Sequence, residues 1–170
     1  QEFIKDKFSE IKFNGLILCL KDDATILNIL FKQNFIQLIK SGGFILDHST
    51  TSLKLINEVA LNDKFTSKNL SFFDAPVSGG EMGAINGTLS IMYGGPNRKT
   101  MIIKKIMNSY SSSITKIGPS GHGQLTKMVN QLCIAGLIQG LAEAITLGKS
   151  SNLNMNKVFD AISGGAAQSW

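Results

Sequence analysis

Cysteine is scarce in this chain, and the two cysteines are not arranged as metal ligands. Cys19 and Cys133 lie far apart and show no C-x-x-C spacing, so neither a disulfide framework nor a cysteine-based metal site is indicated. Both have apolar neighbours, which predicts buried free thiols in a reducing compartment. We expect no bound metal. No secretory signal is visible, which makes the cytoplasm the expected location.

Arginine is also nearly absent, and no basic run alternates with aromatic residues. Arg98 is the only arginine, and the net charge of +5 comes from scattered lysines. Because nucleic-acid sites gather their cations on one surface, we expect no nucleic-acid partner. The apolar stretch that follows residue 121 is interrupted by Gln139, Glu143 and Lys149, so we expect no membrane span.

The sequence does contain enough apolar residues for a sizeable core. Its 170 residues with 43% hydrophobic content predict one domain or slightly more. Apolar runs of strand length alternate with amphipathic helical patterns, which predicts an α/β domain with a mainly parallel sheet. The expected strands are 16–20, 44–47, 71–74, 88–93 and 113–117. The expected helices are 22–31, 53–61 and 97–108, with a further turn over 35–39 that ends at Ser41-Gly42-Gly43.

From Gly121 onward the pattern is helical only. One helix is expected over about 121–150 and another over about 154–162. The long helix is apolar on most sides, so other helices or another subunit must cover it. Because too little helical sequence follows and the chain begins without methionine, we expect a fragment that lacks both ends. Near the start, apolar residues recur at roughly helical spacing, at Phe3, Ile4, Phe8 and Ile11.

A lone lysine stands among amides near the start of the long helix. Gln124, Lys127 and Gln131 are separated by three and four residues, which places them on one helical face. Gly121 and Gly123 permit close backbone approach to another segment. A cation near a helix start is disfavoured by the macrodipole, so the lysine suggests a chemical role. The alternative is a lysine that snorkels from an otherwise buried helix.

A second stretch of interest follows the third expected strand. Ser78-Gly79-Gly80 can present consecutive backbone N–H groups and one hydroxyl to an anion such as a carboxylate. The alternative is a plain turn, since glycine pairs are common after strands. The following stretch is unusually rich in glycine, which favours a backbone that lies close to a ligand. Its glycines are Gly83, Gly87, Gly94 and Gly95.

Both stretches resemble the signatures of one enzyme family. Asp74-Ala-Pro-Val-Ser-Gly-Gly, followed by Gly83-Ala and Gly87-Thr-Leu-Ser-Ile-Met-Tyr-Gly-Gly, resembles the substrate-binding signature of the β-hydroxyacid dehydrogenases. This is the family of 3-hydroxyisobutyrate dehydrogenase and tartronate semialdehyde reductase. The stretch from Gly118 to Gln131 is similar to the catalytic-lysine segment of the same family. The resemblance extends from Leu16 to Trp170 and covers nearly the whole chain.

The resemblance implies an NAD- or NADP-dependent oxidoreductase that interconverts a short β-hydroxyacid and its semialdehyde. Lys127 is then the general acid/base, and Ser78, Gly79 and Gly80 hold the substrate carboxylate. The amide of Gln131 helps to orient the reacting oxygen, at a position where the family often has asparagine. The implied nicotinamide contacts are Leu20, Lys21, Thr25 and Thr50, with Lys21 in place of a usual proline.

The family's G-x-G-x-x-G phosphate loop does not occur in these residues. The resemblance therefore implies the C-terminal part of a Rossmann-like doubly wound α/β sheet, followed by the start of an all-α domain with a long interdomain helix. We expect residues 1–118 to form a partial NAD(P)-binding domain. Residues 119–170 are expected to form a partial helical domain for substrate binding and dimerisation, through which the protein is a homo-oligomer.

Three rival interpretations remain open. 6-Phosphogluconate dehydrogenase has a similar lysine helix, but it carries His-Asn where this chain has Asn130-Gln131. A noncatalytic relative could use the same fold for binding or assembly, although it would have no reason to keep Lys127. An intact small binding protein is disfavoured by the uncovered apolar helix.

Overall fold

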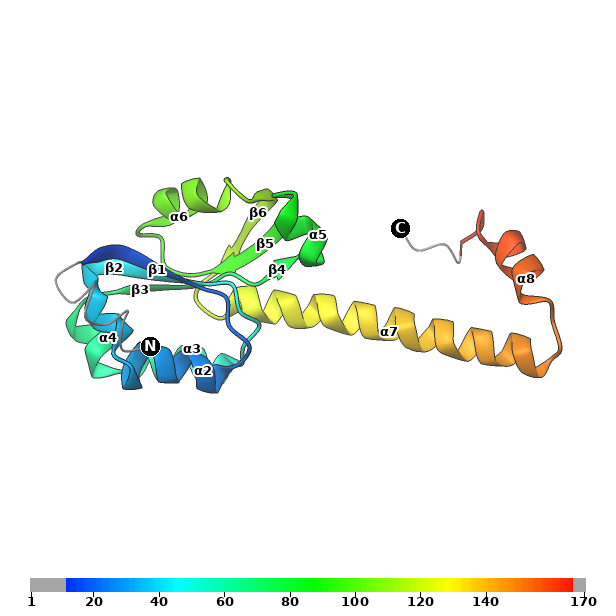
Figure 1. Cartoon of the computed structure of the whole chain (residues 1–170), viewed down its shortest axis with the longest axis horizontal. Helices are drawn as coiled ribbons and strands as arrows, with labels where there is room; N and C mark the ends of the chain where they lie inside the picture. Colours follow the sequence, from blue (N-terminus) through cyan, green and yellow to red (C-terminus); the bar gives the residue numbers. More distant parts are fainter. Residues whose placement is uncertain (1–11, 167–170) are drawn as a thin grey trace. The chain divides into compact units, whose positions relative to one another are not determined.

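A mixed sheet of six strands organises the computed structural model, which describes residues 12–166 (Figure 1). The chain divides into two units, residues 1–128, which contain the sheet, and residues 129–170, which are helical. The helical spacing of Phe3, Ile4, Phe8 and Ile11 lies outside the described residues. The prediction of partial domains over 1–118 and 119–170 stays a prediction.

The sheet combines two parallel sets of strands that meet in an antiparallel pairing. β1, β2 and β3 are parallel neighbours, and β5 is parallel to β6. β3 and β4 both pair with β5 in the antiparallel sense, because the chain turns back after β4 through the short helix α5 (Gly80–Ile85). The expected mainly parallel sheet is therefore mixed. The strands are β1 (Phe13–Leu18), β2 (Ile39–Asp47), β3 (Ser71–Asp74), β4 (Val77–Ser78), β5 (Leu89–Gly94) and β6 (Ser111–Gly118).

Helices cover both faces of this sheet (Figure 1). One face is covered by α2, α3 and α4 and the other by α6. Successive strand residues point to opposite faces, so Ile45 and Phe72 pack under α2 and α3, whereas Leu46 and Phe73 pack under α6. This is why the central strands read as continuous apolar runs. The helices are α2 (Asp23–Leu27), α3 (Leu53–Leu61), α4 (Asp63–Ser67) and α6 (Thr100–Met107), with a π-helical turn η1 (Asn28–Lys32) and a 3-10 turn η2 (Phe35–Leu38).

The glycine pair that was expected to end a helical turn lies instead inside β2. Gly42 adopts a φ of 72°, and a Cβ on Gly43 would lie 2.6 Å from the carbonyl oxygen of Asn14. The pairing of β1 with β2 is irregular between Phe13 and Gly15. These glycines therefore serve a close, irregular strand pairing rather than a helix end.

The second unit continues the helix α7 (His122–Ser150) and adds α8 (Met155–Ile162). Asn154 caps α8, because its side chain accepts a hydrogen bond from the Lys157 backbone N–H. Many apolar side chains of α7 are exposed, and Leu132 is 73% exposed. By length and composition α7 could cross a membrane, unlike our sequence expectation. A single such helix is weak evidence for a span, since core helices have the same composition.

Both cysteines are exposed, which corrects the prediction of buried thiols. Cys19 lies one residue beyond β1, and Cys133 lies on the part of α7 that belongs to the second unit. Apolar sequence neighbours indicated burial, but Cys19 lies where the strand has already ended. The neighbours of Cys133 on α7 are themselves largely exposed.

Candidate active site

A buried carboxylate fixes the start of α7 against the end of β3. Asp74 Oδ1 accepts a hydrogen bond from the Gly121 N–H at 2.7 Å, and Oδ2 accepts one from the Gln124 N–H at 2.9 Å. These N–H groups have no partner within the helix, so the Asp74 carboxylate caps the N-terminus of α7. Burial raises the pKa of Asp74, and the N–H donors oppose that rise.

Glycine lets the first turn of α7 lie directly on the sheet. A Cβ on Gly123 would lie 2.3 Å from the Asp74 carbonyl oxygen and 2.9 Å from that of Met92. Gly121 adopts a φ of 96°, a conformation that favours glycine. The expected close backbone approach is therefore present at Gly123, which lies against β3 and β5, whereas the atoms nearest a Cβ on Gly121 belong to the Leu53 and Ile56 side chains.

Lys127 is the sixth residue of α7 and points back to the β4 segment. Its half-buried side chain donates from Nζ to the Val77 carbonyl oxygen at 2.9 Å. Val77 directly precedes Ser78. The two stretches singled out in the sequence, fifty residues apart, are thus brought side by side within the first unit.

The Ser78-Gly79-Gly80 segment has the backbone of a tight turn into a helix. Gly79 and Gly80 adopt φ values of 125° and 61°, which side chains other than glycine rarely adopt. Both are exposed, and α5 begins at Gly80. The Ser78 hydroxyl makes no hydrogen bond to any residue in the described range 12–166. Together with the first N–H groups of α5, it is available to an anion.

The loops after β1 and β2 lie together at the carboxyl ends of these parallel strands. The Leu20 N–H donates to Ser49 Oγ at 2.8 Å, and the Ser52 N–H donates to Asp23 Oδ1 at 3.1 Å. Thr50 is exposed between two buried residues, Ser49 and Thr51. The structure therefore brings two of the predicted cofactor contacts, Leu20 and Thr50, onto adjacent loops.

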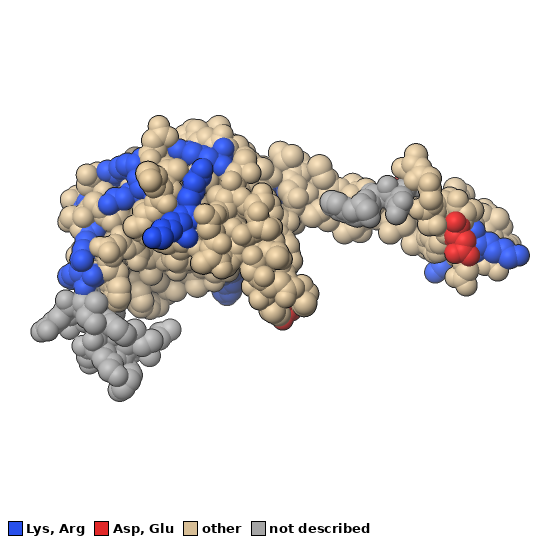
Figure 2. All heavy atoms as spheres, turned by 90° about the horizontal axis from the view of Figure 1, so that it is seen from above, with Lys and Arg blue, Asp and Glu red and all other residues tan. Residues whose placement is uncertain are grey.

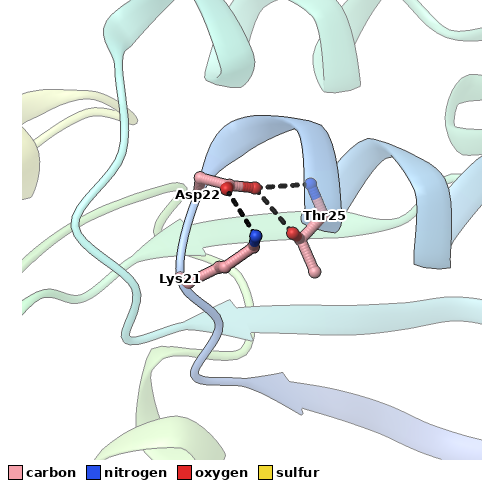
Figure 3. Close-up of polar contacts among 3 residues, drawn as sticks. All are labelled: Lys21, Asp22 and Thr25. Atoms are coloured by element: carbon pink, nitrogen blue, oxygen red, sulfur yellow. Dashed lines mark hydrogen bonds and ion pairs between the residues drawn. The ribbon is translucent and has the colours of Figure 1, made fainter.

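The other two predicted cofactor contacts are engaged with Asp22, the cap of α2 (Figure 3). Asp22 Oδ1 accepts hydrogen bonds from the Thr25 N–H at 2.8 Å and from Thr25 Oγ1 at 2.6 Å. Lys21 Nζ lies 3.5 Å from Asp22 Oδ2. The Thr25 hydrogen bonds lower the pKa of Asp22. Thr25 can therefore offer a ligand only its oxygen, and the exposed Lys21 ammonium already has an anionic neighbour.

These loops fit the nicotinamide end of a dinucleotide. Open α/β sheets bind ligands in the crevice outside the carboxyl ends of their parallel strands, and the exposed Thr50 hydroxyl lies there. The same edge contains two buried oxygens without a protein partner in the described part of the chain, Asp47 Oδ2 and Thr51 Oγ1. A pyrophosphate would need a glycine-rich turn at a helix start, and these 170 residues contain no G-x-G-x-x-G.

Asp47 and His48 were not singled out in the sequence, although both follow an apolar run as the functional loop begins. Asp47 pairs with Asp74 on the neighbouring strand. Burial raises the pKa of Asp47 to about 6, the Ser49 hydrogen bonds oppose the rise, and the Asp74 and Asp23 charges add to it. The signal in the sequence was two adjacent titratable residues, Asp47 and His48, at the end of a buried strand.

His48 links three segments of the first unit. Its Nδ1 lies 2.7 Å from the Ala75 carbonyl oxygen, and its Nε2 lies 2.8 Å from the Tyr110 hydroxyl. Burial lowers the pKa of His48, so the ring is neutral. Nδ1–H then donates to Ala75, and Nε2 accepts from Tyr110. No sequence pattern connects residues 62 positions apart.

Positive charge gathers on the unit that contains the sheet. Figure 2 shows Lys and Arg side chains clustered over one of its faces, with little Asp or Glu in view. The sequence has no acidic residue between Glu81 and Glu143. Such a surface attracts anionic ligands from solution. The basic residues of this stretch are Arg98, Lys99, Lys104, Lys105, Lys116 and Lys127.

Gln131 lies four residues beyond Lys127 in α7 and belongs to the second unit. Its Oε1 accepts a hydrogen bond from Asn130 Nδ2 at 3.0 Å, and the side chain is exposed. Within the described residues, no cluster of three or more His, Cys, Asp or Glu side chains is placed to hold a metal ion.

Two family models match the chain from end to end. Residues 2–118 match the NAD binding domain of 6-phosphogluconate dehydrogenase, and residues 121–170 match the NAD-binding domain of NADP-dependent 3-hydroxyisobutyrate dehydrogenase. Together they cover both the sheet and the helical sequence that follows it.

Individual relatives agree with these models. An uncharacterized oxidoreductase of Shewanella frigidimarina is 43% identical over 88% of this chain and 50% of its own length. The 2-hydroxy-3-oxopropionate reductase of Escherichia coli is 31% identical over 91% of this chain and 52% of its own length. A structure of 3-hydroxyisobutyrate dehydrogenase from Mycobacterium tuberculosis with L-serine superposes with a TM-score of 0.81 at 26% identity, over 97% of this chain and 55% of that one. The chain thus spans about half the length of the curated relatives it matches.

Proposed function

The chain belongs to the β-hydroxyacid dehydrogenase family, which includes 3-hydroxyisobutyrate dehydrogenase and 2-hydroxy-3-oxopropionate reductase, and from this membership we propose that the protein is an NAD(P)-dependent oxidoreductase. Its substrate is a short β-hydroxyacid, of the 3-hydroxyisobutyrate or 2-hydroxy-3-oxopropanoate type. The observation that carries the proposal is the contact of Lys127 with Val77, which joins the proton-transfer group to the proposed carboxylate site.

The substrate carboxylate binds at Ser78-Gly79-Gly80. The support for this role is the unengaged Ser78 hydroxyl and the left-handed backbone of the two exposed glycines. An anion at this place can accept hydrogen bonds from backbone N–H groups, because the two glycines have no side chains to block it. The Lys127 ammonium, which lies at the Val77 carbonyl next to this segment, favours the approach of a small acid.

Lys127 moves the proton at the substrate hydroxyl oxygen. Its Nζ lies beside the segment that holds the carboxylate, so one substrate of a few carbon atoms can reach both groups. Two anchors at opposite ends of a small molecule fix its orientation, which supplies a large part of a rate enhancement. The role of the Gln131 amide in orienting this oxygen is proposed from the family resemblance alone.

When it is bound, the nicotinamide cofactor accepts or donates the hydride. Leu20 and Thr50 hold it at the carboxyl ends of β1 and β2, where their loops are hydrogen-bonded to each other. Lys21 and Thr25 flank that position from the start of α2. The support for this assignment is the exposed Thr50 hydroxyl between two fixed neighbours.

An assay of the full-length protein with paired substrates tests the proposed function. We expect NAD(P)H formation with 3-hydroxyisobutyrate, or NAD(P)H consumption with 2-hydroxy-3-oxopropanoate. The methyl ester of 3-hydroxyisobutyrate keeps the hydroxyl but lacks the carboxylate charge, so it should react poorly. Turnover of 6-phosphogluconate in preference to the short acids would instead support the rival dehydrogenase. Absence of any cofactor-dependent turnover would contradict the proposal.

A further inference from the structure

Gln124 is buried, and its side-chain amide hydrogen-bonds to the two residues that flank Thr50. It is only 1% exposed. Its Nε2 donates to the Ser49 carbonyl oxygen at 2.7 Å, and its Oε1 accepts from the Thr51 N–H at 3.2 Å. These two groups flank Thr50, the exposed residue of the proposed cofactor site. The amide therefore fixes the backbone on either side of Thr50 and leaves the Thr50 side chain free.

The backbone of Gln124 is fixed as well. Its N–H donates to Asp74 Oδ2 at 2.9 Å, and Asp74 ends the strand that leads to Ser78. Gln124 is thus joined to the loop after β2 and to the end of β3. It also precedes Lys127 by three residues on the same helix, which places the two side chains on neighbouring positions of one face.

We propose that Gln124 is a positioning residue that sets the distance between the Thr50 loop and Lys127. The inference rests on the proposed function, in which Thr50 contacts the cofactor and Lys127 transfers the proton. A reaction between two bound molecules requires their sites to be held to within a fraction of an ångström. Three hydrogen bonds to a single helical residue supply that constraint across segments about 75 residues apart in the sequence.

The alternative is a buried glutamine that only satisfies polar groups of the core, as most buried polar side chains do. The two roles predict different effects when Gln124 is replaced. If the glutamine only satisfies core groups, its replacement lowers stability alone. If it is a positioning residue, its replacement also weakens cofactor binding, because the backbone around Thr50 loses its two hydrogen-bond partners.

The variant Gln124→Glu separates these roles through pH. A protonated glutamic acid has the shape of glutamine, and it can donate from its O–H to Ser49 and accept from Thr51. The ionised form has no donor for the Ser49 carbonyl. Burial raises the pKa of a carboxylic acid, so both forms are reachable. The titratable groups on the adjoining segments are Asp74, Asp47, His48 and Asp23. Those nearby on α7 itself are His122 and Lys127, and all six are the same in parent and variants.

The measurement is calorimetric titration of the full-length protein with the oxidised cofactor, NAD or NADP, from pH 5.5 to 8.5. We expect Gln124→Glu to bind like the parent at the lower pH and about tenfold more weakly at the higher pH, the loss expected for one or two buried hydrogen bonds. Gln124→Met, which has a similar size but no amide, should bind more weakly at every pH. Gln37→Met makes the same change at an exposed side chain and should leave binding unchanged.

Amide hydrogen exchange without cofactor provides a second readout. The Thr51 N–H should exchange faster in Gln124→Met, which has no acceptor for it, and should stay close to the parent in Gln124→Glu, which keeps an acceptor oxygen in both ionisation states. If both Gln124 variants keep the parent's cofactor affinity at all pH values while their melting temperatures fall, the positioning role is wrong and the amide is structural. If the parent itself does not bind the cofactor, the proposed function fails and this inference fails with it.

Discussion

Lys127 is the residue on which the proposed chemistry most depends. Its Nζ is fixed by the Val77 carbonyl oxygen next to the proposed carboxylate site. We expect Lys127→Ala in the full-length protein to lower kcat by about two to four orders of magnitude, as removal of a general acid/base does. Cofactor affinity should stay nearly unchanged, because Lys127 lies outside the loops proposed to hold the cofactor. Steady-state kinetics and a separate cofactor titration make the measurement.

The variant Lys127→Arg distinguishes proton transfer from charge. A guanidinium keeps the positive charge but does not release its proton near neutral pH. We therefore expect turnover almost as low as in Lys127→Ala. Near-normal turnover in the arginine variant would remove Lys127 from the acid/base role and leave it as a charge that steers the substrate carboxylate.

Asp47 should make the protein less stable as the pH rises from about 4 to about 6. Its pKa is raised from 3.8 to about 6 in the folded state, so the folded protein binds more protons than the unfolded chain within this window. The free energy of unfolding therefore falls across it, by about 3 kcal/mol if one pKa unit corresponds to about 1.4 kcal/mol. Asp47→Asn, neutral at every pH, should remove this part of the decline.

Urea unfolding of the parent and Asp47→Asn at pH 4, 5, 6 and 7 measures the effect. Asp74, whose pKa is also raised, contributes in the same direction in both proteins, and His48, whose pKa is lowered, in the opposite one. Asp63→Asn removes an exposed carboxylate and controls for net charge. Parallel pH curves for the parent and Asp47→Asn would mean that Asp47 ionises as easily when folded as when unfolded.

At the scale of the elements, the packing of α7 on the sheet depends on the absence of one side chain. We expect Gly123→Ala to lower the free energy of unfolding by about 1–3 kcal/mol, because its Cβ would meet the backbone oxygens of Asp74 and Met92 rather than a movable side chain. Lys127 should be displaced with the helix, so kcat should fall as well. Chemical denaturation and kinetics measure the two effects.

Thr126→Ala is the matched control for this change on the same helix. Among residues 12–166, its hydroxyl bonds only to the His122 carbonyl oxygen of the helix itself, so we expect a change within about 0.5 kcal/mol. Equal stability of Gly123→Ala and the parent would show that the helix and the sheet can separate at no cost. The close contact would then have no part in holding Lys127.

At the scale of the whole molecule, the exposed apolar surface of α7 predicts self-association. Leu137 and Leu141 are 44% and 55% exposed, and Gly136 and Gly140 have open space around them, which lets another helix approach closely. An apolar surface of this extent is rarely left uncovered. We expect the full-length protein to be a homo-oligomer in light scattering, joined through the helices of a second copy.

The double variant Leu137→Asp/Leu141→Asp should shift the protein toward the monomer. Gln139→Asp changes an exposed polar side chain of the same helix, hydrogen-bonded to Glu143, and should leave the assembly intact. A stable monomer of the parent at high concentration would contradict the prediction. A membrane-bound fraction released only by detergent would instead assign α7 to a bilayer.

The sequence predicted elements well where one local pattern dominated. The strand Ser71–Asp74 and the helix Leu53–Leu61 occur at the predicted bounds, because an apolar run and an amphipathic period leave little choice. The long helix begins within one residue of the prediction. The prediction that Ser41-Gly42-Gly43 ends a helical turn was wrong. Glycine occurs both at helix ends and in irregular strands, and only the partner strand decides between the two.

The sequence by itself determined the family, the α/β class and the residues proposed for chemistry, because these are encoded in short motifs and in periodic apolar patterns. Tertiary structure decided which of those residues meet. Lys127 reaches Val77 across fifty positions, Gln124 reaches Ser49 across 75, and His48 reaches Tyr110 across 62. Such contacts depend on how parallel strands and their loops are stacked, and burial then sets the charge state of Asp47 and His48. Local sequence patterns predict neither these contacts nor these charge states, because both depend on the folded surroundings of a residue rather than on its neighbours in the chain.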